Sequence, residues 1–266
     1  MLTNYHTHTT FCDGKNTPEE IVLYAIDKGF SSIGFSGHGH TPFDVRYCMT
    51  DTTGYIEEIS RMKDKYGKKI EIYCGVEEDA FAYVDRQNFD YIIGSSHYLY
   101  IKDKYYPIDS GYDYFERYME AFDNNVLKVS EAYYSTFVSY IKKRKPDIVG
   151  HFDLITKYEE SGTPYFFNNE DYWKIAEKYL RLAAETDVVF EVNAGAMTRG
   201  IRTTPYLGQR LLYVLKEKEG KVILSSDSHK VETLDAYFDE MKCILRDVGF
   251  NHVYEFSKGK FVKRFI

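Results

Sequence analysis

Asn4-Tyr5-His6-Thr7-His8 places two imidazoles one residue apart near the start of the chain. In a β-strand, residues i and i+2 point to the same face, so His6 and His8 would aim at one point. A strand end built in this way can present two ligands to a metal ion. Two surface histidines, or two hydrogen-bonded core histidines, would produce the same five letters. The remainder of the chain has to decide between these interpretations.

Seven of the eight histidines share a local setting, in which an apolar run is followed by small residues and then by histidine. Such a run is typical of a buried parallel strand, and small residues at its end allow a ligand or another backbone to approach closely. Glu77 follows the run 72–76 in the same manner. We therefore predict that these side chains gather where the strands end. The stretches that end in histidine are 5–8, 34–40, 92–97, 148–151 and 223–229.

Length and composition favour one globular domain over residues 1–266. A chain of 266 residues is long enough for an α/β barrel with a large core. Apolar residues make up 44% of the chain and charged residues 28%, which is ordinary for a globular protein. The net charge of −7 argues against nucleic acid as a partner, because phosphate backbones need a basic surface. We expect a small-molecule partner, and an anionic one would need local cations.

The cysteine pattern and the hydropathy predict a cytoplasmic protein. Cys12, Cys48, Cys74 and Cys243 form no C-x-x-C pair, so reduced thiols are the simplest interpretation. The first residues lack the basic and apolar segments of a signal peptide. No stretch approaches the roughly 18 apolar residues of a membrane span, so we expect no membrane association. The sequence gives no prediction of the oligomeric state.

Strands and helices alternate along the chain. Thr17 as N-cap, Pro18 at the first helical position and Glu20 in the capping-box position predict a helix that runs to Gly29. Further helices are predicted at 53–65, 115–143, 173–184, 206–216 and 231–248, strands at 31–36, 70–76, 91–94, 147–150, 188–192 and 222–224, and a hairpin within 251–265. About seven strands followed by a helix or a crossover predict a nearly closed α/β barrel. Its site would lie at the C-terminal ends of the strands.

Tyrosines are frequent between Tyr98 and Tyr114, directly after one of the predicted site strands. Half-buried packing is the ordinary interpretation of such aromatic residues. Their position also allows them to form a wall or a lid over a substrate site.

Seven motifs in order along nearly the whole chain resemble the polymerase and histidinol phosphatase (PHP) family, and within it the histidinol-phosphate phosphatases. The matching stretches are Tyr5–His8 with Cys12–Gly14, Gly34–His38, Gly75–Glu77, Gly94–His97, Gly150–Asp153, Glu191–Asn193 and Ser225–His229. The resemblance implies a single-domain distorted (β/α)7 barrel with a metal site at the C-terminal ends of its strands.

The resemblance also implies that the site holds three divalent metal ions. The implied ligands are His6, His8, Glu77 and Asp227 for the first ion, Glu77 again with His97 and His151 for the second, and Asp13, His38 and His229 for the third. Imidazole and carboxylate ligands without thiolate suit Mn, Fe or Zn.

Ions about 3.5–4 Å apart can clamp a phosphoryl group during in-line displacement and lower the pKa of bound water towards about 7. The resemblance implies hydrolysis of L-histidinol phosphate to L-histidinol and phosphate, with attack by a metal-bridging hydroxide. Another small phosphate monoester is the alternative substrate. A non-catalytic metal-binding module and a metal-dependent amide hydrolase are alternatives from other classes.

In so acidic a chain, phosphate would need cations besides the metal ions. Arg199 and Arg202, in the glycine-containing stretch 193–202 after a predicted strand, are candidate phosphate-binding residues. A solvated basic loop is the other interpretation of this stretch. Arg46 and Arg86 are weaker candidates.

Two more residues are candidates for catalytic roles. His40 could act as general acid for the leaving alkoxide, or be an ordinary loop histidine. Asp153 could orient a ligand imidazole or bind a substrate ammonium. The same choice applies to Glu78 and Asp79.

Overall fold

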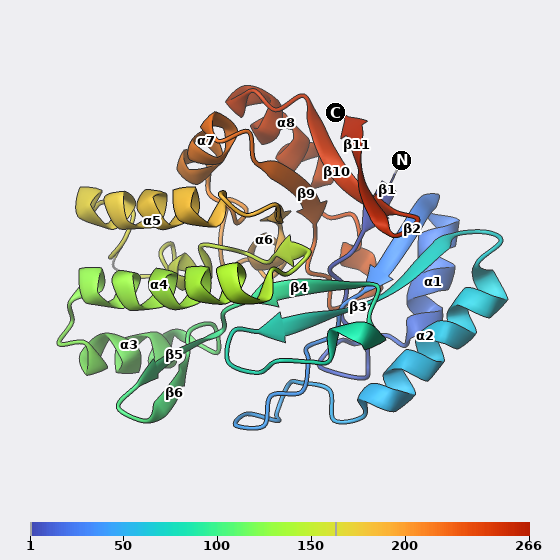
Figure 1. The fold of residues 1–266 in the computed structure, drawn as a ribbon, viewed down its shortest axis with the longest axis horizontal. Helices are drawn as coiled ribbons and strands as arrows, with labels where there is room; N and C mark the ends of the chain where they lie inside the picture. Colours follow the sequence, from blue (N-terminus) through green and yellow to red (C-terminus); the bar gives the residue numbers. More distant parts are fainter. Residues whose placement is uncertain (1, 163) are drawn as a thin grey trace.

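The computed structural model describes residues 2–162 and 164–266, and its central element is a seven-stranded parallel sheet (Figure 1). Its strands, in spatial and in chain order, are β1 (Leu2–Asn4), β2 (Phe30–Phe35), β3 (Glu71–Asp79), β4 (Tyr91–Ser95), β7 (Ile148–Val149), β8 (Val189–Asn193) and β9 (Lys221–Ser225). Beyond the outer strands, Thr7 and Ser228 form a parallel bridge, and the His8 amide donates to the Ser228 carbonyl at 2.8 Å. This bridge joins the two edges of the sheet, so the predicted distorted barrel is confirmed.

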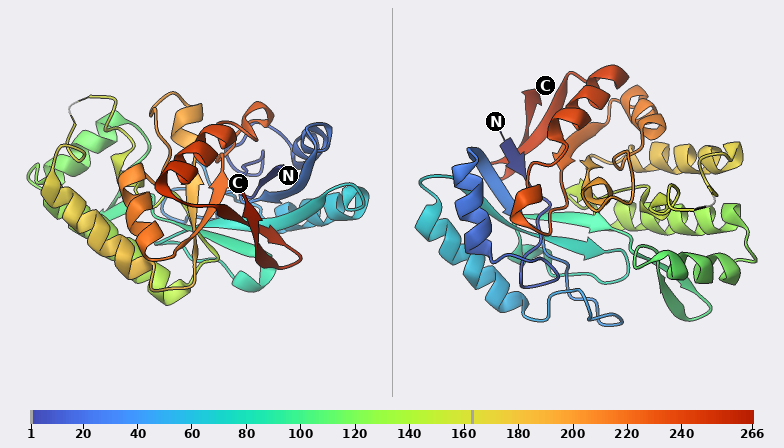
Figure 2. Two further views of the ribbon diagram at one scale, coloured as in Figure 1. Left: turned by 90° about the horizontal axis from the view of Figure 1, so that it is seen from above. Right: turned by 180° about the vertical axis from the view of Figure 1, so that it is seen from behind.

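Helices cover the outside of the barrel, as the two further views in Figure 2 show. They are α1 (Pro18–Asp27), α2 (Thr52–Tyr66), α3 (Tyr112–Ala121), α4 (Val126–Arg144), α5 (Glu170–Ala183), α6 (Gly195–Thr198), α7 (Gln209–Glu217) and α8 (Phe238–Val248), with 3-10 turns at Arg86–Asn88, Leu154–Thr156 and Val231–Thr233. Thr17 and Glu20 form the predicted capping box at the start of α1. Among the described residues, no helix is both long and apolar enough to cross a membrane.

Two helices that the apolar spacing predicts as continuous are broken. The stretch 115–143 is divided into α3 and α4 at Asp123 and Asn124, whose φ angles are 56° and 55°. The stretch 231–248 begins with the 3-10 turn Val231–Thr233 and becomes α-helical only from Phe238, after Tyr237 with a φ of 62°. Left-handed backbone at non-glycine residues is uncommon, and helical periodicity alone does not reveal it.

The tyrosine-rich stretch begins with a hairpin that the sequence did not predict. It consists of β5 (Tyr98–Ile101) and β6 (Lys104–Pro107), joined at Lys102 and Asp103, which both have positive φ. Tyr105 stacks on Phe43, with ring centroids 3.7 Å apart. The hairpin is therefore packed against the loop that follows β2.

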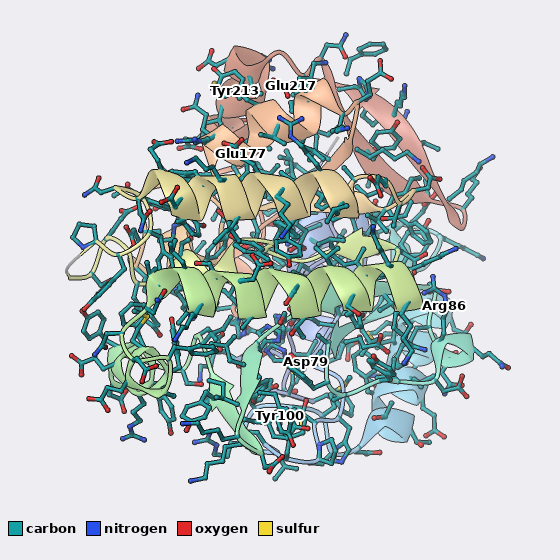
Figure 3. The ribbon with its side chains drawn as sticks, turned by 60° about the vertical axis from the view of Figure 1, so that its left-hand side comes forward. Asp79, Arg86, Tyr100, Glu177, Tyr213 and Glu217 are labelled. Carbon is teal, nitrogen blue, oxygen red and sulfur yellow. The ribbon has the colours of Figure 1, made fainter. Side chains whose placement is uncertain are left out.

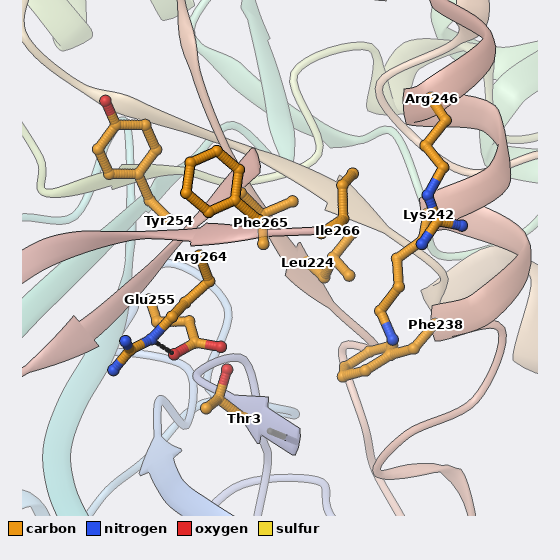
Figure 4. A pocket seen from close by; sticks show the side chains of 11 residues that line it. Thr3, Leu224, Phe238, Lys242, Arg246, Tyr254, Glu255, Arg264, Phe265 and Ile266 are labelled. Carbon is orange, nitrogen blue, oxygen red and sulfur yellow. Dashed lines mark hydrogen bonds and ion pairs between the residues drawn. The ribbon is translucent and has the colours of Figure 1, made fainter. Parts of the chain in front are cut away.

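The N-terminal end of the barrel is filled by aromatic and aliphatic side chains, among them Tyr5, Tyr91 and Phe256. Phe256 belongs to β10 (His252–Ser257), which pairs with β11 (Lys260–Phe265) in the predicted terminal hairpin. The Tyr5 hydroxyl donates to the Phe256 carbonyl at 2.7 Å, and the Tyr91 hydroxyl donates to the Tyr5 carbonyl at 2.5 Å. A cavity of about 290 Å³ lies between this hairpin and α8 (Figure 4). The hairpin thus closes the barrel at this end.

Candidate metal centre

All nine residues that the sequence suggests as metal ligands lie at the C-terminal end of the barrel. Because the strands are parallel, their C-terminal ends meet at one edge, and the residues just beyond them face a common centre. His6 and His8 follow β1, Asp13 lies in the next loop, His38 follows β2, Glu77 lies in β3, His97 follows β4, His151 follows β7, and Asp227 and His229 follow β9.

Glu77 occupies the middle of this group and is only 2% exposed. Its two carboxylate oxygens face different imidazoles, so it can bridge two ions. Burial alone would raise the pKa of Glu77, but His6 and His97 hold it well below the usual range of a glutamate. The imidazole nitrogens nearest to Oε2 belong to His38 at 2.8 Å, His6 at 3.3 Å and His8 at 3.7 Å, and those nearest to Oε1 belong to His151 at 3.0 Å and His97 at 3.3 Å.

Asp227 lies beside the two histidines that follow β1, His6 and His8. Its Oδ1 lies 3.2 Å from His8 Nε2 and 3.7 Å from His6 Nε2. Its backbone has a φ of 49°, which turns the chain sharply after β9. These two imidazoles, Asp227 and Glu77 therefore surround one point.

Asp13 brings a third carboxylate to the cluster, on its outer side. Its Oδ2 lies 3.3 Å from His229 Nε2, and its Oδ1 lies 3.7 Å from His38 Nε2 and from His8 Nδ1. The His38 ring stands between two groups, since its Nδ1 faces Glu77 and its Nε2 faces Asp13. The arrangement offers a separate position for an ion at Asp13.

Several of these ligand atoms are buried without a hydrogen-bond partner among the described residues. They are His6 Nε2, His8 Nε2, Asp13 Oδ1 and Glu77 Oε2. A buried polar atom without a partner costs about 1–3 kcal/mol, so a cluster of them needs a compensating partner. Imidazole nitrogens and carboxylate oxygens are ligands of Mn, Fe and Zn. The residues therefore fit divalent metal ions.

Protonation of the imidazoles differs within the cluster. Burial and the neighbouring His229 and His38 lower the pKa of His8 to about 3, so its ring is neutral and ready to bind a metal ion. Burial also lowers the pKa of His6, but the carboxylates of Glu191 and Glu77 outweigh this effect and raise the pKa of His6 well above its usual value. An ion that binds His6 would displace a proton.

Two carboxylates orient the ligand imidazoles: Asp79, for which the sequence suggested this role as one of two, and Glu191, for which it suggested none. Glu191 Oε1 lies 2.7 Å from His6 Nδ1, and Glu191 Oε2 accepts from the His151 amide at 3.2 Å. Asp79 Oδ2 accepts from the His97 amide at 2.9 Å and lies 3.3 Å from His97 Nδ1. Such contacts hold each ring with Nε2 towards the centre. For Glu191, the sequence signals were its place in the predicted strand 188–192 and in one of the motifs that carry the family resemblance.

The cluster opens into a cavity of about 770 Å³. Beyond the ligands, the cavity is lined by the cations Lys15, Arg46, Lys157, Arg199 and Lys230, by the carboxylates of Asp44 and Asp109, and by the tyrosines Tyr47, Tyr98 and Tyr114. Tyr98 and Tyr114 show that the tyrosine-rich stretch forms part of the cavity wall in addition to packing. The cavity therefore combines a metal-binding floor with cations and carboxylates around it.

The four arginines suggested for phosphate binding lie in different places. Arg199 lines the cavity, and its Nη2 donates to Asp227 Oδ2 at 3.0 Å. Arg202 is only 4% exposed, donates to Thr156 Oγ1 and lies over the Tyr206 ring, so the structure does not bring it to the cavity. Arg46 lies at the cavity wall. Arg86 forms an ion pair with Asp147 at the edge of the molecule (Figure 3).

The structure does not bring the two suggested catalytic residues to the cluster. His40 is exposed, and its Nδ1 lies 3.1 Å from the Met49 carbonyl. Asp153 is buried, its Oδ2 accepts from the Gly208 amide at 3.0 Å, and burial raises its pKa. Among the described residues, Asp153 has no hydrogen bond to a ligand imidazole. Glu78 binds Arg144, with 2.6 Å between its Oε2 and Nη2.

Comparison with known proteins identifies a family and several relatives that resemble this chain. A family model described as PHP domain matches residues 4–195. The chain is 25% identical over 284 residues to a probable histidinol-phosphatase of Schizosaccharomyces pombe, with 97% of this chain and 90% of the relative covered. It is 26% identical over 250 residues to the histidinol-phosphatase of Bacillus subtilis, with 85% and 92% covered. A solved structure of histidinol phosphate phosphatase from Lactococcus lactis, in complex with zinc, L-histidinol and phosphate, matches with a TM-score of 0.67 at 21% identity, covering 98% of each chain.

Proposed function

The chain belongs to the PHP family, and from that premise we propose that it is a metal-dependent phosphatase that hydrolyses L-histidinol phosphate to L-histidinol and phosphate. The observation that carries this proposal is the group of buried imidazole and carboxylate atoms at the open end of the barrel, several of which find no hydrogen-bond partner in the part of the chain that the structure describes. The relatives named histidinol-phosphatase align with this chain over nearly its whole length, which supports the choice of substrate.

We propose that the centre holds three divalent ions, each Mn, Fe or Zn. The nine ligands already described would hold them, with Glu77 shared between the first and the second ion. When bound, such ions lower the pKa of water and withdraw charge from a phosphoryl group, which is the chemistry that phosphate ester hydrolysis requires. Glu191 and Asp79 contribute by fixing the imidazoles of His6 and His97 before the ions bind.

The cations of the cavity would bind the phosphoryl oxygens on the side away from the ligands. Asp227 fixes the Arg199 guanidinium at the rim of the centre through the 3.0 Å hydrogen bond. Lys157 reaches the same cavity, and its Nζ donates to the Asp109 carbonyl at 2.8 Å. A guanidinium and an ammonium fixed in this way recognise a dianionic phosphate without prior rearrangement.

Another small phosphate monoester is the alternative substrate, and the test is a comparison of esters. Phosphate release would be measured for the Mn-loaded protein on L-histidinol phosphate, glycerol phosphate, phosphoserine and p-nitrophenyl phosphate. We expect kcat/KM to favour L-histidinol phosphate by two or more orders of magnitude, as in sites that bind polar substrate groups. Equal and slow turnover of all four esters would contradict the proposed substrate. No turnover of any ester by fully metal-loaded protein would indicate a non-catalytic metal-binding module.

A further inference from the structure

The cavity contains two carboxylates that do not belong to the metal centre, and their hydrogen bonding differs. Asp44 is fully engaged, because its oxygens accept from Arg46 Nε at 2.7 Å, from Arg46 Nη2 at 2.6 Å and from the Tyr98 hydroxyl at 3.0 Å. Among the residues that the structure describes, the carboxylate of Asp109 is engaged more loosely, by one ion pair. Its nearest cation is Lys157, whose Nζ lies 3.5 Å from Oδ2. Asp109 therefore presents a carboxylate to the cavity that can accept another cation.

The backbone that carries Asp109 is held firmly beside the metal centre. The Asp109 carbonyl accepts from Lys157 Nζ and from the Tyr158 hydroxyl, each at 2.8 Å. The preceding residue, Ile108, is fully buried, and its amide donates to the carbonyl of the candidate ligand His97 at 2.9 Å. The backbone at Asp109 is thus fixed relative to the ligand set before a substrate arrives.

We propose that Asp109 binds the ammonium group of the substrate and so determines specificity for a 2-amino phosphate ester. This inference rests on the proposed function. In L-histidinol phosphate the ammonium is attached to the carbon next to the phosphorylated CH2 group. When the phosphate lies at the metal centre, the ammonium therefore lies only a few bonds from it. Asp109 lines the same cavity, beside the His97 ligand, and supplies the negative charge that such an ammonium needs.

The surrounding charges make this role specific. Lys157, Arg199 and Lys230 line the cavity with positive charge, which suits the phosphate and would repel a substrate ammonium. The Asp44 carboxylate is already paired with Arg46, so the ammonium would have to displace a guanidinium held by two hydrogen bonds. Among the described residues, the one ion pair of the Asp109 carboxylate is the longer 3.5 Å contact with Lys157 Nζ. A phosphate ester that carries the amine gains an ion pair with Asp109. An ester that lacks the amine does not, and Lys157 then remains the only cation proposed to pair with this carboxylate.

The test compares Asp109→Asn with wild type on two esters that differ only in the amine, L-histidinol phosphate and 3-(imidazol-4-yl)propyl phosphate. Loss of a hydrogen bond between charged groups should lower kcat/KM for L-histidinol phosphate about 10- to 100-fold. The value for the amine-free ester should change less than about 3-fold, because that ester never made the contact. Asp113→Asn is the matched control, since this carboxylate is 61% exposed and does not line the cavity. Metal content by mass spectrometry should be the same in all three proteins.

The outcomes separate this inference from the proposed function. An equal loss on both esters, or no loss on either, would overturn the role of Asp109 while wild-type turnover of L-histidinol phosphate still supported the proposed function. A wild-type protein that hydrolyses neither ester would overturn the proposed function and the inference together. Calorimetric titration with L-histidinol in the presence of inorganic phosphate gives a second readout, in which Asp109→Asn should bind at least about 10-fold more weakly than wild type.

Discussion

The N-terminal and C-terminal ends of the seven-stranded barrel differ in whether their buried polar atoms have hydrogen-bond partners. At the N-terminal end, Tyr5 and Tyr91 are buried among apolar side chains, and each hydroxyl donates to a backbone carbonyl. At the C-terminal end, His6 Nε2, His8 Nε2 and Glu77 Oε2 are equally buried and have no hydrogen-bond partner among the described residues. The first region is complete as a protein core, whereas the second requires bound ions. This difference predicts that substitutions at the two ends have separable effects on stability and on activity.

The largest expected effect is loss of activity from a substitution at the open end. His8→Ala removes an imidazole that lies 3.2 Å from Asp227 Oδ1 and 3.7 Å from Glu77 Oε2. Turnover should fall by more than the roughly 100-fold that is typical for loss of a residue that supports a ligand. Metal content by mass spectrometry should fall, while the apoprotein should unfold at nearly the wild-type temperature. His252→Ala, on the terminal hairpin, is the matched control and should retain both metal and turnover. Strong destabilisation of apo His8→Ala would contradict the separation of the two ends.

A substitution at the N-terminal end of the barrel, which the terminal hairpin closes, should lower stability and leave metal binding and activity unchanged. Phe256→Ala opens a cavity beside Tyr5 and Tyr91, and loss of a buried phenylalanine costs about 3–5 kcal/mol of unfolding free energy. The measurement is urea unfolding of the apoprotein, together with metal content and turnover at low temperature. We expect lower stability with metal content and kcat close to wild type. A variant that folds but cannot bind metal would show that the two ends are coupled.

A smaller effect is expected where a carboxylate orients a ligand. Glu191→Gln keeps the shape of the side chain but weakens its 2.7 Å contact with His6 Nδ1. Loss of such support lowers metal affinity or activity about 10- to 100-fold. Titration of the apoprotein with Mn²⁺ should therefore show a higher Kd, and excess Mn²⁺ should restore part of the turnover. If excess metal restores nothing, Glu191 does more than orient His6.

The smallest effect is expected from removal of one hydroxyl at the closed end. Tyr91→Phe removes the hydroxyl that donates to the Tyr5 and Phe35 carbonyls, at a cost of about 1–3 kcal/mol. Thermal unfolding measures this cost, and turnover should not change. Gly75 makes room for the same ring, because a Cβ there would collide with Tyr91. An unchanged melting temperature would mean that the hydroxyl contributes no net stability.

The architecture and the meeting of the strand ends could be predicted because both depend on periodicity. Apolar runs that end in small residues and histidine indicate parallel strands, and parallel strands bring their C-terminal ends to one edge. Thr17, Pro18 and Glu20 fixed the start of α1 in the same local way. The breaks at Asp123 and Tyr237 could not be predicted, since a left-handed residue leaves the apolar spacing on both sides unchanged.

The distances within the site could not be predicted, because residues beyond a strand end can turn in any direction. Arg199 and Arg202 are three residues apart, yet only Arg199 faces the cavity and Arg202 is buried over Tyr206. His40 is two residues from His38 and points to the Met49 carbonyl instead of the cluster. The supporting role of Glu191 depends on its distance to His6, which lies 185 positions away in the chain.

The most direct test of the metal-dependent function is a titration of the apoprotein with Mn²⁺ in which bound metal and hydrolysis of L-histidinol phosphate are measured on the same samples. We expect no turnover without metal, and a rise in turnover that follows bound metal and stops at three ions per chain. In His8→Ala, both bound metal and turnover should stay low. Turnover by the metal-free protein, or a wild-type protein that binds three ions and still does not release phosphate, would contradict this function.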